Sequence, residues 1–306
     1  MLYPWLISKF NELEKRIHSH KLHHAILLHG ESGVGIDELA FELAHALLCI
    51  NDGPRPCGSC KGCNLIAAES HPDFHLIVSD KTQIGVDLVR SAIEKINNTA
   101  QLSGNKVVLV PNIDLMTEAA ANAFLKTLEE PTNNTFLIMT SQAAHLLLPT
   151  IKSRCEKHVI AMPDYAQSVN YISSQSEAAP SELELKAYGN SPLKYLNAKV
   201  NKEPSFQGFM EDLNAIKDNA LSTDELAKKY KEYPSQVVDW LFALLLEKQI
   251  ESIKQPQTSQ NARSIAQWIE TELNVAKQKL KQTGTNKQLL ISYLMGSFKS
   301  NLSFVL

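Results

Sequence analysis

The chain has 306 residues, of which 44% are hydrophobic and 21% are charged, and its formal net charge is -3 at pH 7. This length allows two or three domains, and the composition is typical of a globular protein, which excludes a disordered or fibrous chain. The small net charge argues against tight nucleic-acid binding through a global positive field, but it leaves room for a local basic face.

The N-terminal segment, residues 1–20, has no basic stretch that leads into a sustained apolar run, so we expect no signal peptide. No apolar run approaches the roughly 18 residues that a membrane span requires. We therefore expect a cytoplasmic protein. In a reducing compartment, the five cysteines are expected to be metal ligands or free thiols rather than disulfides.

Residues 1–164 alternate between strand-like and helix-like patterns. The apolar runs expected to form buried strands cover 25–30, 73–78, 106–111 and 135–141. The helical patterns between these runs cover 37–49, 84–98 and 117–130. Thr117 is placed to cap the last of these helices. Strands that alternate with helices predict a parallel sheet with both faces covered, and hence an α/β domain.

The octet GESGVGID begins like a phosphate-binding loop, with Gly30, Gly33 and Gly35 between an apolar strand and a helix. The pattern G-x-x-x-x-G-K-[ST] then requires a lysine and a hydroxyl residue, but the chain has Ile36 and Asp37. Ile36 cannot neutralise a phosphate, and a carboxylate about 4 Å from a phosphate would repel it by roughly 4 kcal/mol. The octet alone leaves ATP hydrolysis, weak nucleotide binding and a structural turn open, and it favours the structural turn.

A second part of the ATP-hydrolysing machinery is also altered. Enzymes of this kind have an acidic pair after a buried strand, which holds magnesium and polarises the attacking water. Here the strand pattern at 107–110 is followed by Pro111 and Asn112, and Asp114 lies at the wrong offset. Because two independent parts are missing together, the sequence predicts that ATP hydrolysis has been lost.

A cysteine cluster with the pattern C-x7-C-x2-C-x2-C is formed by Cys49, Cys57, Cys60 and Cys63. Each C-x2-C step places two thiolates on one turn, and four thiolates complete a closed, tetrahedral structural zinc site. We therefore predict zinc; an iron–sulfur cluster and free thiols are the alternatives. His71 and His75 are possible substitute ligands, although four cysteines are sufficient.

The second half of the chain is helical in pattern. Residues 165–205 predict a small domain of short helices, and strand signals disappear beyond about residue 206. Long amphipathic helical patterns cover 235–253, 262–280 and 286–305. The large aromatic residues of this part are expected to lie mainly in the core, although they are also plausible interface anchors: Trp240, Trp268 and Tyr293.

Several motifs together resemble bacterial clamp-loader subunits of the AAA+ superfamily. They are HAILLHGESGVG, the four-cysteine insertion, AAANAFLKTLEEPTNNTFLIMTS and LLPTIKSRC. The resemblance covers about residues 4–165. It implies a P-loop NTPase-like α/β domain at 1–164 with a zinc knuckle at about 49–63. It also implies a helical lid domain at 165–205 and a helical collar domain at 206–306 that joins subunits.

The resemblance further assigns a role to the S-R-C motif, residues 153–155. In clamp loaders the arginine of this motif reaches ATP bound by the neighbouring gamma/tau subunit, so Arg154 would be an arginine finger that acts in trans. Without the resemblance, Arg154 would be an ordinary surface arginine. Nucleotide-binding members also carry an arginine in a G-S-x-R-like stretch of the second domain, where this chain has Pro192 or Leu193.

The resemblance thus implies a subunit of the DNA polymerase III holoenzyme that is not an ATPase by itself and that helps to load the sliding clamp onto primed DNA. The expected partners are the gamma/tau and delta subunits, with the clamp and DNA contacted through the complex, and no membrane. One alternative is an AAA+ ATPase with an atypical phosphate loop, which Ile36, Asp37, Pro111 and Asn112 count against. A zinc-containing nucleic-acid-binding module is the other alternative, and the low net charge and the lack of an aromatic–basic cluster argue against it.

Overall fold

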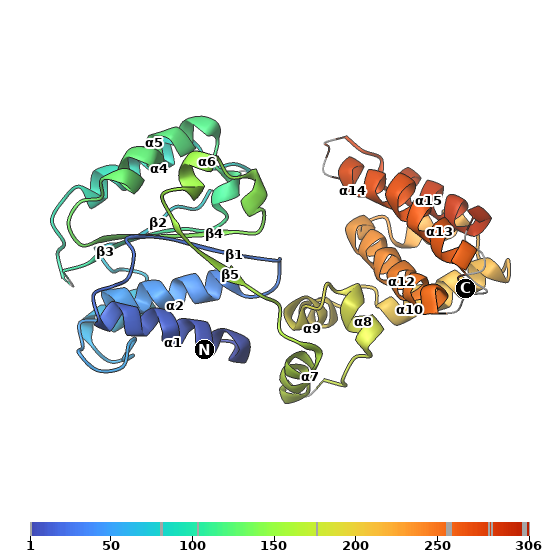
Figure 1. The fold of residues 1–306 in the computed structure, drawn as a ribbon, viewed down its shortest axis with the longest axis horizontal. Helices are drawn as coiled ribbons and strands as arrows, with labels where there is room; N and C mark the ends of the chain where they lie inside the picture. Colours follow the sequence, from blue (N-terminus) through green and yellow to red (C-terminus); the bar gives the residue numbers. More distant parts are fainter. Residues whose placement is uncertain are drawn as a thin grey trace. The chain divides into compact units, whose positions relative to one another are not determined.

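The computed structural model describes residues 2–79, 82–102, 104–175, 177–254, 259–280, 282, 284–301 and 305. The chain forms two compact units, Met1–Pro163 and Asp164–Leu306 (Figure 1). The first unit contains two buried hydrophobic clusters, and the second contains one. The boundary of the α/β domain predicted at residue 164 stays a prediction, and so does the further division at residue 205.

The first unit is built on a five-stranded parallel sheet with the order β2-β3-β4-β1-β5. The strands are β1 Ala25–Gly30, β2 Phe74–Leu76, β3 Lys106–Val110, β4 Thr135–Ser141 and β5 Glu156–Ile160. The predicted parallel α/β domain is therefore confirmed. Strand β5 was not predicted, because it lies at the edge of the sheet and mixes polar residues with apolar ones, unlike the apolar central strands.

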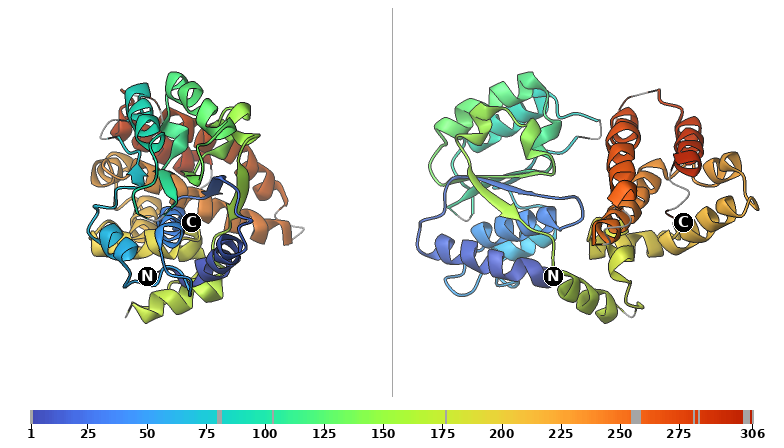
Figure 2. Two further views of the ribbon diagram at one scale, coloured as in Figure 1. Left: turned by 90° about the vertical axis from the view of Figure 1, so that its left-hand side faces the viewer. Right: turned by 45° about the vertical axis from the view of Figure 1, so that its right-hand side comes forward.

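Helices cover both faces of this sheet, as Figures 1 and 2 show. Helices α1 (Pro4–His18) and α2 (Ile36–Leu48) lie on one face, and α4 (Val86–Ile96) and α5 (Glu118–Glu129) lie on the other. Because successive side chains of a strand point to opposite faces, alternate residues of β1 belong to different cores. Ile26 and Leu28 pack with α1 and α2. Ala25 and Leu27 pack with α4 and α5.

Short elements complete the first unit: α3 (Lys61–Ala67), α6 (Pro149–Lys152) and the 3-10 turns Ile113–Leu115 and Ala144–Leu146. The predicted cap of α5 is confirmed, because the Thr117 side chain accepts a 3.2 Å hydrogen bond from the Ala120 amide. This cap satisfies one of the backbone N–H groups that a helix start leaves without a partner.

The second unit is helical throughout its described part. Its helices are α7 Tyr165–Ser174, α8 Glu182–Ala187, α9 Pro192–Val200, α10 Phe206–Lys217, α11 Thr223–Lys229, α12 Pro234–Lys254, α13 Ser259–Trp268, α14 Asn274–Leu280 and α15 Lys287–Asn301, with a π-helical turn at Ile269–Leu273. The predicted helix at 286–305 includes residues 302–304, which lie outside the described residues. In the described chain, every helix is too short or too polar to cross a lipid bilayer.

Trp240 lies at the centre of the second unit. It is fully buried and contacts Tyr188, Phe209 and Tyr230, with ring centroids 5.3–6.1 Å apart. Trp268 is also buried. Both confirm the expectation that large aromatic residues fill the core.

The same expectation is wrong for Tyr293, whose surface is 57% exposed. The buried face of α15 is formed by Leu290, Ile291, Leu294, Met295 and Phe298. Tyr293 lies outside this face, one helical turn after the exposed Leu289.

Candidate functional site

The octet that begins like a phosphate loop forms a glycine turn between a strand and a helix. Strand β1 ends at Gly30 and helix α2 begins at Ile36. Gly33 and Gly35 have φ angles of 85° and 89°, a left-handed conformation that only glycine adopts readily. The predicted context of a phosphate loop is therefore present at the carboxyl end of a central strand.

Aromatic side chains from the N-terminal segment cover this turn. The Trp5 indole N–H donates a 2.8 Å hydrogen bond to the Val34 carbonyl, and the Tyr3 and Trp5 rings stack 5.1 Å apart. A Cβ atom added to Gly35 would lie 2.6 Å from Tyr3 Cδ2. The space directly beside Gly35 is thus filled by a side chain of this chain.

The two residues that replace the lysine and the hydroxyl residue have internal roles. Ile36 is 3% exposed and belongs to the core beneath α1 and α2. Asp37 accepts a 2.6 Å hydrogen bond from the hydroxyl of Thr140, at the end of β4. The Thr140 oxygen in turn accepts a 3.0 Å hydrogen bond from the backbone N–H of Asn112, which follows β3. These bonds connect the start of α2 to the ends of two neighbouring strands.

This arrangement has little of the chemistry that ATP hydrolysis needs. The octet carries no basic side chain, and Asp37, in place of a magnesium-binding hydroxyl, is engaged with Thr140. Asn112, where an acidic residue is needed, has a φ angle of 50° and contributes its backbone N–H. In the second unit, Pro192 and Leu193 open helix α9 and bring no charge, while Ser191 caps that helix through the Lys194 amide.

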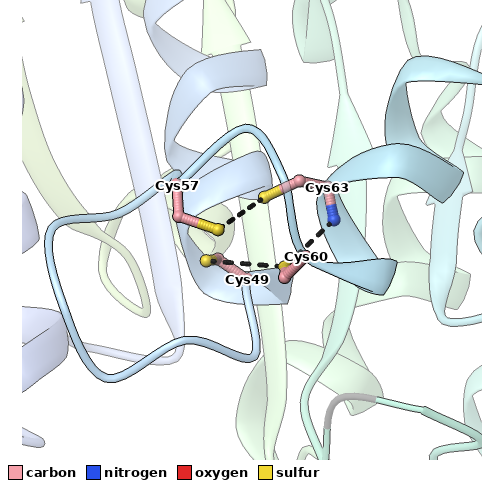
Figure 3. Close-up of side chains that lie close together, drawn as sticks. All are labelled: Cys49, Cys57, Cys60 and Cys63. Carbon is pink, nitrogen blue, oxygen red and sulfur yellow. Dashed lines mark hydrogen bonds between the residues drawn. The ribbon is translucent and has the colours of Figure 1, made fainter.

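The four cysteines of the predicted metal site come together at the end of α2 and the start of α3 (Figure 3). All four Sγ atoms lie within 4.8 Å of one another. The Cys49–Cys60 and Cys57–Cys63 pairs are each 3.9 Å apart. A tetrahedral site with Zn–S distances of about 2.3 Å has S···S edges of about 3.8 Å, so the cluster has the dimensions of a four-thiolate metal site.

The local structure affects the four thiols differently. Hydrogen bonds from the Ser59 and Cys60 amides lower the pKa of the Cys57 thiol to about 5, whereas burial raises the pKa of Cys49 and that of Cys63. Metal ligation needs the deprotonated form, which Cys57 favours. Gly62 is required for packing, because a Cβ atom there would lie 2.4 Å from the Leu48 carbonyl oxygen. This close approach holds α3 against the end of α2 and so positions the ligands.

The two candidate substitute ligands lie outside the cluster. Within the described chain, the group of possible metal ligands at this place consists of the four cysteines alone. The His71 Nδ1 atom accepts a 3.1 Å hydrogen bond from the Asp73 amide. Burial lowers the pKa values of both His71 and His75, so each favours its neutral form.

Arg154 lies in the turn between α6 and β5. One terminal nitrogen of its guanidinium donates a 2.8 Å hydrogen bond to the Thr150 carbonyl, and the other forms an ion pair with the Glu129 carboxylate at the end of α5. The Arg154 side chain keeps 32% of its surface exposed. The next residue, Cys155, is buried in the core, which fixes the backbone of the motif.

Some participants in these sites were not identified from the sequence. The Trp5 contact with Val34 gives no sequence signal, because it depends on how α1 packs. Thr140 does give one: it is a polar residue near the end of an otherwise apolar strand pattern. Thr140 pairs with Leu28 of the neighbouring β1, close to the glycine turn that follows that strand, and its hydroxyl is bonded there to Asp37.

The parallel order β2-β3-β4-β1-β5, with a glycine turn and a helix directly after β1, is an AAA+-like arrangement of the P-loop NTPase-like class. Its phosphate loop lacks the residues that act on ATP, and it carries a four-cysteine cluster after the first helix of the βα unit.

Known proteins specify the family. The family model described as "DNA polymerase III, delta subunit" matches residues 7–164. DNA polymerase III subunit delta' of Haemophilus influenzae is 33% identical over 279 residues, which cover 89% of this chain and 85% of that protein. The Pseudomonas aeruginosa subunit is 34% identical over 258 residues, which cover 80% of this chain and 77% of that protein. The Escherichia coli subunit is 40% identical over 176 residues, which cover 56% of this chain and 53% of that protein. The chain belongs to the DNA polymerase III delta' family.

Proposed function

We propose that this protein is a clamp-loader subunit of the DNA polymerase III holoenzyme that does not hydrolyse ATP itself. In this role it assembles with gamma/tau and delta subunits in the cytoplasm and helps to load the sliding clamp onto primed DNA. Membership of the delta' family supports the role. The internal use of Ile36 and Asp37 supports the absence of ATP hydrolysis.

In this proposal Arg154 contributes to hydrolysis of ATP that is bound by a neighbouring gamma/tau subunit. A guanidinium is always charged and can donate two parallel hydrogen bonds to phosphate oxygens, which stabilises the charge of the transition state of phosphoryl transfer. The partial exposure of the Arg154 side chain, on a turn flanked by the buried Ile151 and Cys155, is the observation that carries this assignment.

Zinc is the proposed occupant of the four-cysteine cluster. The pattern of four thiolates and the 3.9 Å sulfur pairs suit a tetrahedral ion with no open position. A closed site of this kind has a structural role, which here is to fix α3 against the end of α2.

We also assign residues 165–205 to a lid domain and residues 206–306 to a collar domain that contacts other subunits. Apolar side chains one turn apart on α12 support an interface. Their exposed fractions are 37% for Leu246, 45% for Ile250 and 66% for Ile253. Exposed apolar stripes of this kind are typical of surfaces that a partner covers.

The test of the proposal is the substitution Arg154→Ala in a complex reconstituted with gamma/tau and delta subunits. An arginine finger contributes a factor of roughly 10³ or more to hydrolysis, so the ATP site that Arg154 serves should become almost inactive. Clamp- and DNA-stimulated ATPase should then fall to the turnover of the remaining sites. Lys152→Ala, on the same short segment, is the matched control and should leave the rate unchanged. An unaltered rate with Arg154→Ala would reject the assignment.

A further inference from the structure

We infer that Glu129 is a positioning residue for the Arg154 guanidinium. This inference rests on the proposed function of Arg154 and adds a second residue to it. Glu129 does not contact the nucleotide in this scheme. It acts through the ion pair that its carboxylate forms with one terminal nitrogen of the arginine.

Both residues are attached to fixed parts of the first unit. Glu129 is the last residue of α5, which is anchored in the core by Phe124 and Leu128. Arg154 stands directly before the buried Cys155 and follows a short helix anchored by the buried Ile151. The two backbones are therefore held by packing, whereas both side chains reach into solvent, with exposed fractions of 32% for Arg154 and 48% for Glu129.

The contacts of the Arg154 guanidinium restrict its orientation but leave some of its N–H donors without an acceptor in the described part of the chain. Glu129 binds one terminal nitrogen, and the Thr150 carbonyl binds the other. A guanidinium has five N–H groups in a rigid fork, so this fork keeps donors for a phosphate of a neighbouring subunit. These two acceptors, one on each terminal nitrogen, thus orient the remaining donors before any neighbour arrives.

The free energy of the Glu129–Arg154 ion pair is better explained by positioning of the arginine than by a contribution to folding. Ion pairs between exposed side chains contribute little to folding stability. A free arginine side chain, however, samples many rotamers, and it must lose this freedom when it binds a phosphate. Restraint in advance reduces that loss and increases the fraction of time in which the reactive geometry is present. Glu129 should therefore affect the rate of the chemical step more than the stability of the subunit.

The adjacent residue provides a matched control. Glu130 is also an exposed glutamate, and it is the C-cap of the same helix. Among the described residues, no ion pair is formed with Glu130, whereas Glu129 pairs with Arg154. Equal substitutions at the two positions change the net charge equally, so a difference between them reports the contact with Arg154.

The experiment compares Glu129→Ala, Arg154→Ala, the double variant and Glu130→Ala in the reconstituted complex. We expect Glu129→Ala to lower the kcat of stimulated ATP hydrolysis at the Arg154-dependent site by about tenfold and to leave KM for ATP unchanged. Glu129→Gln, which keeps an acceptor oxygen, should lower kcat less than Glu129→Ala does. Thermal unfolding and assembly of each variant should match those of the parent protein.

The double variant separates the possible outcomes. If Glu129 acts through Arg154, Glu129→Ala should have no further effect in the Arg154→Ala background. An equal loss in both backgrounds would show that Glu129 acts independently and would overturn the inference, as would an unchanged or higher rate with Glu129→Ala alone. If Arg154→Ala lowers the rate and Glu129→Ala does not, the proposed function stands and the positioning role fails. If Arg154→Ala has no effect, the proposed function itself fails.

Discussion

The hydroxyl of Thr140 donates a 2.6 Å hydrogen bond to the carboxylate of Asp37, which lies 103 residues earlier in the chain. The Thr140 side chain is fully buried at the end of β4, and Asp37 is in the first turn of α2. The residue that would repel a phosphate therefore connects the helix after the glycine turn to the sheet. The altered phosphate loop has acquired a structural function.

The first prediction is that Asp37→Ala destabilises the protein by about 1–2 kcal/mol, because the buried Thr140 hydroxyl loses its acceptor. Urea-induced unfolding of the full chain measures this change. Glu38→Ala is the matched control: it removes an acidic residue from the same first turn and so removes a similar interaction with the helix dipole. Glu38 accepts an exposed 3.3 Å hydrogen bond from the Tyr3 hydroxyl. Equal effects of the two substitutions would contradict a special role for the Asp37–Thr140 bond.

The second prediction is that the isolated protein does not turn over ATP with magnesium. Ile36 brings no charge to the β and γ phosphates, and Asp37 is already bonded to Thr140. Nucleotide binding should also be weak. If Kd exceeds 1 mM, for example, about 1 mM ATP would raise the free energy of unfolding by less than about 0.4 kcal/mol. Phosphate-release assays and thermal unfolding with and without ATP check both parts. Robust magnesium-dependent turnover by the pure chain would refute this prediction.

The sequence predicts the central part of the fold because the local signals are strong there. β1 and β4 have the predicted bounds, since central strands buried on both faces require continuous apolar runs. The cysteine cluster is predictable for a different reason: the C-x2-C spacing brings the thiolates together on local turns. Strand β5 could not be predicted, because Glu156–Ile160 has a mixed polar and apolar pattern. Its strand conformation depends on the pairing with β1, which the sequence does not show.

The contacts that determine how the sites work are largely tertiary. Asp37 and Thr140 meet only when α2 and β4 are packed, and Glu129 meets Arg154 only when α5 lies beside the turn before β5. Neither pair has a sequence spacing that predicts it. The exposure of Tyr293 illustrates the same limit, because an aromatic residue in an amphipathic pattern can lie just beside the buried face.

The third prediction concerns the metal. The purified protein should contain about one zinc per chain, and Cys60→Ser should reduce the zinc content to near zero, because Cys60 is one of the four converging thiols. Elemental analysis gives the content, and thermal unfolding should show a lower Tm for the metal-free protein. Cys155→Ser is the control, since Cys155 lies in the separate core beneath α4 and α5 and its loss should leave zinc in place. Full zinc content in Cys60→Ser would contradict a four-cysteine site.

The fourth prediction is a pH dependence of stability that involves His158. This side chain is 6% exposed, and burial lowers its pKa below the usual 6.5. The Glu156 carboxylate, 3.2 Å from Nε2, acts in the opposite direction, but Glu156 is itself paired with Arg16. Burial is the larger influence, so His158 is mainly neutral in the folded protein near neutral pH.

The direction of this pH dependence follows from proton binding. As the pH falls through 6.5, the unfolded chain protonates this histidine more readily than the folded protein does, so the free energy of unfolding decreases. The contribution of His158 is fully present above this pH and is lost below it. Urea unfolding at about pH 7.5 and about pH 5.5 should therefore show lower stability at the acidic value. Other buried histidines contribute to the same slope, because burial lowers the pKa of His45, His71 and His75 as well.

The variant His158→Gln isolates the contribution of this one histidine to the pH dependence of stability. Glutamine is neutral at both pH values, so the variant should lose less stability than the parent protein between about pH 7.5 and about pH 5.5. Any loss of packing from the substitution is the same at both values and cancels in the difference. Because the cysteine cluster is unchanged in the variant, metal release at acidic pH cancels too. Identical pH slopes for the two proteins would show that His158 binds protons equally well in the folded and unfolded states.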